Sequence, residues 1–159
     1  MNVAITIAIA TVLLFALAFA TKRRFGVLGL ALAAGAMLSE LWAEKLTPFF
    51  SEAGLVIETP PLQTVIAVAL VLMPALLLLF SGPSYQDKVM RVVGAACFAI
   101  LAAALLIDPL GSGLVLVGDG REIYNFIITN KVYIVTTGLM VALIDILGVH
   151  TSKRAYKKH

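Results

Sequence analysis

Long apolar stretches alternate with short polar segments along the whole chain. A helix needs about 20 mostly apolar residues to cross roughly 30 Å of hydrocarbon. Lipid-exposed backbone must also satisfy its own hydrogen bonds, which favours helices over irregular structure. We therefore predict an all-α integral membrane bundle, a single domain over residues 1–159. Its five transmembrane helices are expected at about Val3–Thr21, Val27–Leu46, Pro61–Phe80, Val89–Ile107 and Val132–Val149.

The composition supports lipid as the main solvent of the side chains. Of the 159 residues, 61% are hydrophobic and 13% are charged, whereas soluble domains have about 45–50% apolar and about 25% charged residues. A soluble domain of this size leaves too much surface in water to hide so many apolar side chains. The single cysteine, Cys97, excludes an internal disulfide framework. Because no catalytic, metal-binding or phosphate-binding motif is found, we expect no enzyme activity, no cofactor and no nucleic-acid partner.

The basic residues indicate how the chain is threaded. They cluster at Lys22–Arg24, at Lys88 and Arg91, and in the tail 150–159. Loops and tails on the cytoplasmic side carry an excess of Lys and Arg. Placing these three clusters inside puts nine of the 12 Lys and Arg residues there. The sequence thus predicts an outside N-terminus and a cytoplasmic C-terminus. Signal peptides carry their positive charge before the apolar region, so Met1–Ala20 is predicted to be a retained helix.

The connecting segments carry their own local signals. We predict an outer loop over Thr47–Thr59 and an N-cap for the fourth helix at Ser84. In Arg121–Thr129, the apolar residues fall on one helical face. This pattern predicts a short interfacial helix that joins the fifth span near Asn130 and Lys131.

Asp145 is the most informative single residue. It lies about one turn from the predicted cytoplasmic end of the fifth span, and Gly138 and Ala142 share its helical face. An aspartate on a face of small residues is expected to point into protein rather than lipid. Carboxylates inside membranes are costly and often functional. The alternative is a buried, hydrogen-bonded anchor, or a group that pairs with a lysine or arginine of the tail.

A second group of polar residues lies near the predicted outer side. Glu40 and Glu44 are one helical turn apart, with Trp42 between them. They are interpreted either as the wet interfacial end of a helix or as an acidic vestibule that attracts cations. Lys131 is expected to reach the outer surface, and Asp108 and Glu122 are the candidate partners for an ion pair with it.

Pro74 interrupts the third apolar stretch and is expected to kink that helix. The kink is interpreted as a matter of shape, with gating as the alternative.

Small residues recur at helical spacing in the second and fourth spans. This pattern lets helix backbones approach closely. We interpret it as packing within the chain, with a dedicated oligomer interface as the alternative. The residues are Gly29, Ala31, Ala33, Gly35 and Ser39 in the second span, and Ala95, Ala99 and Ala103 in the fourth.

Residues 1–110 resemble the colicin V production protein (CvpA-like) family. The resemblance rests on KRRFG at Lys22–Gly26, LTPFF at Leu46–Phe50 and DKVMRVVGAACF at Asp87–Phe98. The last segment is similar to the family's Asp-Arg-x-x-Gly-x-x-x-Gly run, with Lys88 in place of the arginine and a shifted glycine spacing. The chain departs from the family's four-span plan over about residues 111–159. The resemblance implies an inner-membrane protein linked to bacteriocin export and envelope homeostasis, and it supplies no catalytic residues.

Two classes of function follow from these features. The first is a structural or accessory component of a bacterial inner membrane that assembles with itself, as a homo-oligomer, or with another membrane protein. The second is a small ion channel or transporter formed by a homo-oligomer, in which Asp145, Glu40 and the kink at Pro74 line a path. Packing residues outnumber candidate path charges, so we favour the first class.

Overall fold

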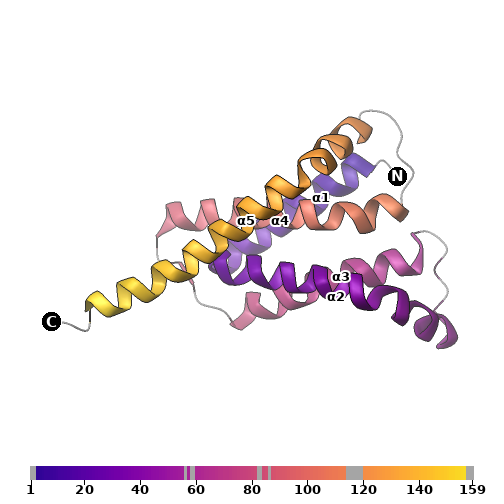
Figure 1. Ribbon diagram of the computed structural model, residues 1–159, viewed down its shortest axis with the longest axis horizontal. Coiled ribbons are helices and arrows are strands. Elements are labelled where there is room, and N and C mark those ends of the chain that lie inside the picture. Colours follow the sequence, from indigo (N-terminus) through magenta and orange to yellow (C-terminus); the bar gives the residue numbers. More distant parts are fainter. Residues whose placement is uncertain are drawn as a thin grey trace.

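The computed structural model describes residues 3–55, 57, 60–81, 84–85, 87–113 and 120–156, and in this part of the chain every extended element of secondary structure is a helix. Successive helices run in opposite directions, and α5 crosses the outside of the bundle and extends beyond it (Figure 1). The helices are α1 (Val3–Thr21), α2 (Phe25–Glu52), α3 (Leu62–Ser81), α4 (Lys88–Gly113) and α5 (Gly120–Tyr156).

Four of these helices contain segments that are long and apolar enough to cross a membrane. Within α1, the segment Ala8–Thr21 is apolar but shorter. By length and composition, the chain is therefore a multi-pass membrane protein, as the apolar stretches predicted. The four long segments are Phe25–Glu52, Leu62–Ser81, Lys88–Gly111 and Tyr124–Gly148.

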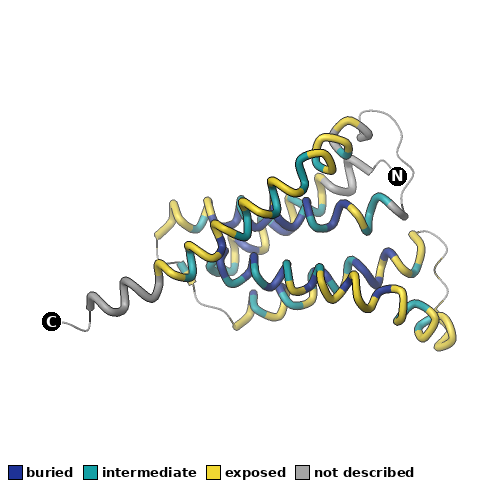
Figure 2. Tube along the Cα trace, viewed as in Figure 1, coloured by how far each residue is buried: buried dark blue, intermediate teal, exposed yellow. Residues whose placement is uncertain are grey.

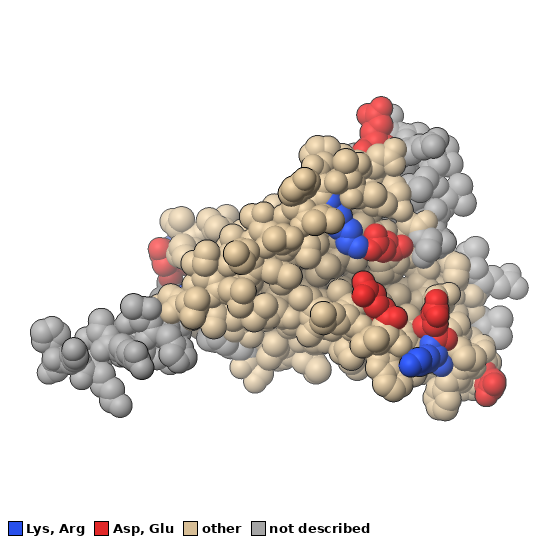
Figure 3. All heavy atoms as spheres, viewed as in Figure 1, with Lys and Arg blue, Asp and Glu red and all other residues tan. Residues whose placement is uncertain are grey.

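The outer surface of the bundle has the character of a lipid-facing surface. Large apolar side chains are exposed on it, among them Phe80 (79%) and Val132 (72%). Only 6% of the apolar window of α5 is buried in the protein, and in Figure 2 the part of α5 that is coloured by burial is mostly exposed or intermediate. A wide band without charged side chains crosses the middle of the face drawn in Figure 3. Soluble monomers rarely expose contiguous apolar surface on this scale.

The core is built from all five helices. Leu14 of α1, Leu32 of α2, Val71 of α3, Phe98 of α4 and Ala142 of α5 belong to one buried cluster. The most extensive contact between two helices is that of α2 with α3, followed by that of α1 with α4. Among the described buried residues of this cluster, α5 contributes Ala142 alone, so apolar packing holds it less tightly than it holds α2, α3 or α4.

Three helices extend beyond the predicted spans. α2 continues through Pro48 to Glu52, so the first part of the predicted loop Thr47–Thr59 is helical. α4 continues through Pro109 to Gly113. The predicted interfacial helix over Arg121–Thr129 is not a separate element, because it forms the beginning of α5. The helix does not break at Asn130, whose side-chain amide donates a hydrogen bond of 2.8 Å to the carbonyl of Phe126.

The prediction of Ser84 as the N-cap of the fourth helix is wrong. α4 begins at Lys88, and Asp87 Oδ1 accepts a hydrogen bond of 3.3 Å from the backbone N–H of Val89. Ser84 instead pairs with Arg23 in an isolated antiparallel bridge. Asp87 is the N-cap because its carboxylate lies directly before the first turn of α4. The unpaired backbone N–H groups of that turn favour a negative charge.

The contact between α2 and α3 depends on a glycine. A Cβ added at Gly35 would collide with the backbone carbonyl oxygens of Val71 and, at 2.8 Å, Leu70. Pro74 lies one turn further along α3 and has no N–H to offer Leu70. Gly35 therefore lets α2 approach the stretch of α3 in which the regular helical hydrogen bonding is interrupted.

We expect Gly35→Ala to destabilise the folded protein, because the added methyl group meets backbone rather than a flexible side chain. The expected loss is about 1–3 kcal/mol, as for other overpacked cores. The measurement is unfolding of the purified protein in detergent, followed by the loss of helical circular dichroism.

The matched control for this prediction is Gly148→Ala on α5, where a Cβ meets nothing within 4 Å. Its stability should stay the same or rise slightly, since Ala favours helix more than Gly does. Equal stability of the two variants would contradict the close packing at Gly35.

Candidate functional site: two polar ends of the bundle

The turns between α1 and α2 and between α3 and α4 meet at one end of the bundle. Lys22 has a left-handed backbone, with φ of 58°, and its carbonyl accepts a hydrogen bond of 2.8 Å from the backbone N–H of Tyr85. Arg23 and Ser84 form the bridge described above. Two of the three basic clusters in the sequence therefore share one end, as the predicted threading requires.

Two arginines at this end cap the C-termini of neighbouring helices. Arg23 donates from Nε to the carbonyl of Leu79 and from a terminal nitrogen to the carbonyl of Phe80, each at 2.8 Å. Arg91 donates from Nε to the carbonyl of Phe19 at 2.6 Å, and its guanidinium lies 4.1 Å from the centre of the Phe19 ring. The last carbonyls of a helix lack partners within the helix and carry partial negative charge. The arginines thus stabilise the ends of α1 and α3.

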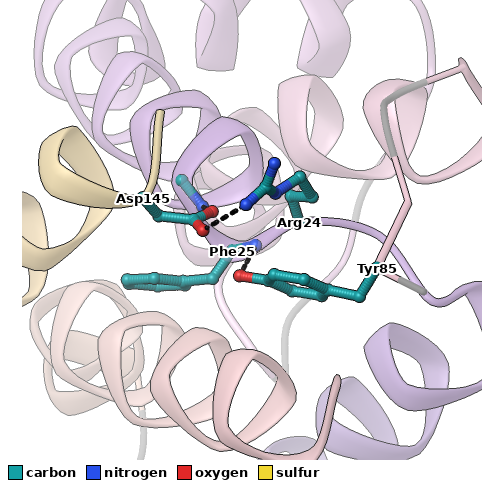
Figure 4. Close-up of polar contacts among 5 residues, drawn as sticks. Arg24, Phe25, Tyr85 and Asp145 are labelled. Carbon is teal, nitrogen blue, oxygen red and sulfur yellow. Dashed lines mark hydrogen bonds and ion pairs between the residues drawn. The ribbon is translucent and has the colours of Figure 1, made fainter. Parts of the chain in front are cut away.

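Asp145 caps the N-terminus of α2 from a different helix (Figure 4). Its Oδ2 accepts a hydrogen bond of 2.9 Å from the backbone N–H of Gly26. Its Oδ1 lies 3.1 Å from a terminal nitrogen of Arg24, and the two side chains are 10% and 22% exposed. The backbone N–H of Phe25 donates to the Tyr85 hydroxyl at 3.2 Å. The first two N–H groups of α2, which no helical carbonyl can reach, therefore both have side-chain partners.

The Arg24 side chain contacts both Asp145 and Tyr85. Its guanidinium lies 5.1 Å from the centre of the Tyr85 ring, a distance suited to a cation–π contact. Its Nε atom is buried and has no hydrogen-bond partner within the described part of the chain. Burial raises the pKa of the Tyr85 phenol above its ordinary value, and the negative charge of Asp145 adds to this effect, while the hydrogen bond from Phe25 and the charge of Arg24 oppose it. Tyr85 therefore stays neutral at physiological pH.

Gly26 makes the approach of α5 to α2 possible. A Cβ at this position would lie 2.6 Å from the carbonyl oxygen of Ala142 and 3.0 Å from Asp145 Oδ2. Ala142 is fully buried, so α5 packs on α2 through small residues on both helices. The predicted small-residue face of Asp145 does face protein, and its partner is Arg24 of the first basic cluster rather than a residue of the tail.

The opposite end of the bundle contains a polar cavity. Along α2, Glu40 lies about 20 Å from Gly26, at 1.5 Å of rise per residue. The cavity has a volume of about 300 Å³ and is formed by α2, α3, α4 and Lys131 of α5. Figure 3 shows acidic and basic side chains gathered toward this end of the face in view. The polar residues that line the cavity include Ser39, Glu40, Glu44, Thr64, Asp108 and Lys131.

The groups in this cavity differ in how they are partnered. Lys131 donates a hydrogen bond to Asp108 and forms an ion pair with it. Of the two predicted candidates, Asp108 and Glu122, the partner of Lys131 is therefore Asp108. Ser39 and Thr64 are 7% and 4% exposed. In the described ranges, no group of three His, Cys, Asp or Glu residues lies close enough to hold a metal ion.

The structure brings some of the predicted residues together and separates others. Glu40, Glu44 and Lys131 share the cavity, whereas Asp145 lies at the opposite end and Pro74 lies within α3 between them. Sequence reasoning missed Arg23 and Tyr85 as capping residues and Thr64 as a cavity residue. Thr64 stands in an apolar run, where a single hydroxyl gives no distinct signal.

No protein-family model, curated protein or solved structure matches the chain.

We expect Asp145→Ala to destabilise the protein by about 1–3 kcal/mol, because it leaves the N–H of Gly26 and the charge of Arg24 without partners. Asp145→Asn retains one acceptor oxygen and should cost less. Arg24→Gln combined with Asp145→Asn should show a coupling of at least about 0.5 kcal/mol in a double-mutant cycle. The measurement is the free energy of unfolding in detergent.

Glu44→Gln is the control for this cycle, since Glu44 is an exposed carboxylate at the other end of the same helix. It should change the stability by less than about 0.5 kcal/mol. Strict additivity of the Arg24 and Asp145 variants would show that the two side chains do not support each other.

Proposed function

We propose that the chain is a multi-pass protein of a bacterial inner membrane that works as a structural or accessory component, assembling with itself or with another membrane protein. The observation that carries this proposal is that the Asp145 carboxylate is already occupied by hydrogen bonds within the chain. The carboxylate best suited by sequence to serve transport accepts hydrogen bonds from Gly26 and Arg24. It thus contributes to the fold rather than lining a water-filled path.

The packing of the bundle also favours an assembly role over a path through a single chain. Between Asp145 at one end and Glu40 at the other lies a core whose side chains include Leu32, Val71 and Ala102, each 0–1% exposed. An ion that moved along the bundle axis would have to cross this dense apolar layer, where an unpaired charge is very costly.

Two further points agree with the assembly role. α5 is nearly unburied within the chain, so much of its surface is open to lipid or to another membrane helix. The resemblance of residues 1–110 to the CvpA-like family implies a role in export or envelope homeostasis, and we propose that role for this chain.

A channel or transporter is the second candidate, and the polar cavity around Glu40 favours it. A cavity that opens at one end and is lined by carboxylates can attract cations. Such a function would need a path supplied at the interface between several chains, because the core of one chain is closed.

In detergent, the protein is expected to form a stable multimer, with a protein mass that is a multiple of 16.9 kDa after subtraction of the micelle. In liposomes, it should produce no K⁺ or proton leak above that of protein-free vesicles. Light scattering coupled to size exclusion and a fluorescent flux assay measure these two properties.

A selective leak that Glu40→Gln abolishes and Glu52→Gln leaves intact would support the channel and contradict the assembly proposal. The comparison is matched, since both glutamates are exposed residues of α2 and only Glu40 lines the cavity. A strictly monomeric protein without a partner would also count against assembly.

We further propose that the end of the bundle with Lys22–Arg24 faces the cytoplasm, because basic residues are retained on that side. Green fluorescent protein fused after His159 should fluoresce, and alkaline phosphatase at the same place should be inactive. Fusions truncated after Gly54, at the other end of α2, should give the reverse pattern. Active phosphatase after His159 would overturn this orientation.

A further inference from the structure

The cavity at the Glu40 end contains hydroxyl groups that the fold leaves unused. Ser39 and Thr64 line it and are more than nine-tenths buried. Neither side chain makes a hydrogen bond to a residue that the structure describes. Among the described residues, the fully buried side-chain atom without a partner is Arg24 Nε, so both hydroxyl oxygens are open to the cavity. Two hydroxyls that face one cavity and that the fold does not use are available to bind a polar occupant.

The charge of the cavity favours a cation. Glu40 and Glu44 both line it, and neither forms an ion pair with any described residue. Lys131 balances Asp108 only. The two remaining carboxylates make the cavity acidic, which raises the local concentration of cations.

The walls limit the kind of cation that fits. No aromatic side chain lines the cavity, so the described residues lack the ring cage with which quaternary ammonium ions are usually bound. They also lack a cluster of three acidic, His or Cys residues suited to a metal ion. Small apolar residues, including Ala36, Ala67 and Val71, complete the lining. This surface suits a short alkyl chain.

We propose that the cavity binds small primary alkylammonium ions. An ammonium group has three N–H donors, and Ser39, Thr64 and Glu40 offer three acceptors in the same cavity. The alkyl chain would lie against the alanines and valine of the wall, and a volume of about 300 Å³ accommodates a chain of a few carbon atoms. This site goes beyond the proposed assembly role, and the two are independent of each other.

The test uses n-propylammonium chloride as the probe and the full chain purified in detergent at pH 7. Isothermal titration calorimetry, with micelles alone as the blank, should show saturable binding with one site per chain. Tetramethylammonium, which has the charge without N–H donors, and n-propanol, which has the alkyl chain without the charge, should each bind at least about tenfold more weakly. Thermal unfolding should shift upward with propylammonium only, since ligands stabilise the state that they bind.

Substitutions within the cavity separate this site from general attraction to an acidic surface. Thr64→Val keeps the volume and removes the hydroxyl, and it should weaken propylammonium binding about three- to tenfold, the usual effect of one hydrogen bond. Glu40→Gln should weaken it by a similar or larger factor. Glu52→Gln, an exposed residue of α2 outside the cavity, should leave binding unchanged.

Three results would overturn the proposal. They are equal affinity for propylammonium and tetramethylammonium, unchanged binding in Thr64→Val when this variant has wild-type helical content, and heats indistinguishable from the micelle blank. A multimer that fails to bind propylammonium would refute the site and leave the assembly proposal standing. A monomer that binds propylammonium would support the site and count against assembly.

Discussion

The bundle depends on satisfying the backbone groups at helix ends, where a helix cannot supply its own hydrogen bonds. In lipid the requirement is severe, because water does not reach such groups within the hydrocarbon. At one end of this protein, other elements meet the need. Arg91 donates a hydrogen bond to the C-terminal end of α1, and Arg23 donates to that of α3. Tyr85 and Asp145 accept hydrogen bonds from the first N–H groups of α2. Each contact ties a helix end to a neighbouring helix or turn, so the same interactions cap the helices and build the tertiary structure.

The basic cluster after α1 consequently acts in two ways. Its charge favours one side of a membrane, and its side chains hold the helix ends together. Arg23 binds the carbonyls at the negative C-terminal end of α3, while Arg24 pairs with Asp145. The carboxylate at the positive end of α2 follows the direction of the helix dipole. Asp145 is thus favourable where it lies, even though a carboxylate in a membrane helix is costly without partners.

The sequence predicted those features that depend on local pattern, and it missed those that depend on distant contacts. Four spans were predictable because apolar length is a local property, and the inward face of Asp145 followed from Ala142 three residues earlier. The pairing of Asp145 with Arg24 joins residues 121 positions apart, and no local pattern indicates it. The ends of the second and fourth spans were placed too early, at Leu46 and Ile107, because they were taken from the apolar stretches, whereas both helices continue through a proline, Pro48 and Pro109. Membrane helices tolerate proline where neighbouring groups satisfy the freed backbone.

The two ends of the bundle differ in how completely their polar groups are satisfied. At the capped end, charged side chains, turns and helix termini form one connected network, in which Arg24 Nε is the unpaired buried side-chain atom among the described residues. At the cavity end, the hydroxyls of Ser39 and Thr64 make no hydrogen bond to described residues and are open to the cavity, and two carboxylates lie beside them. These hydroxyls contribute no contact to the bundle, whereas the side chains of the capped end hold helix termini together. The contrast supports a structural role for the capped end and the proposed binding role for the cavity.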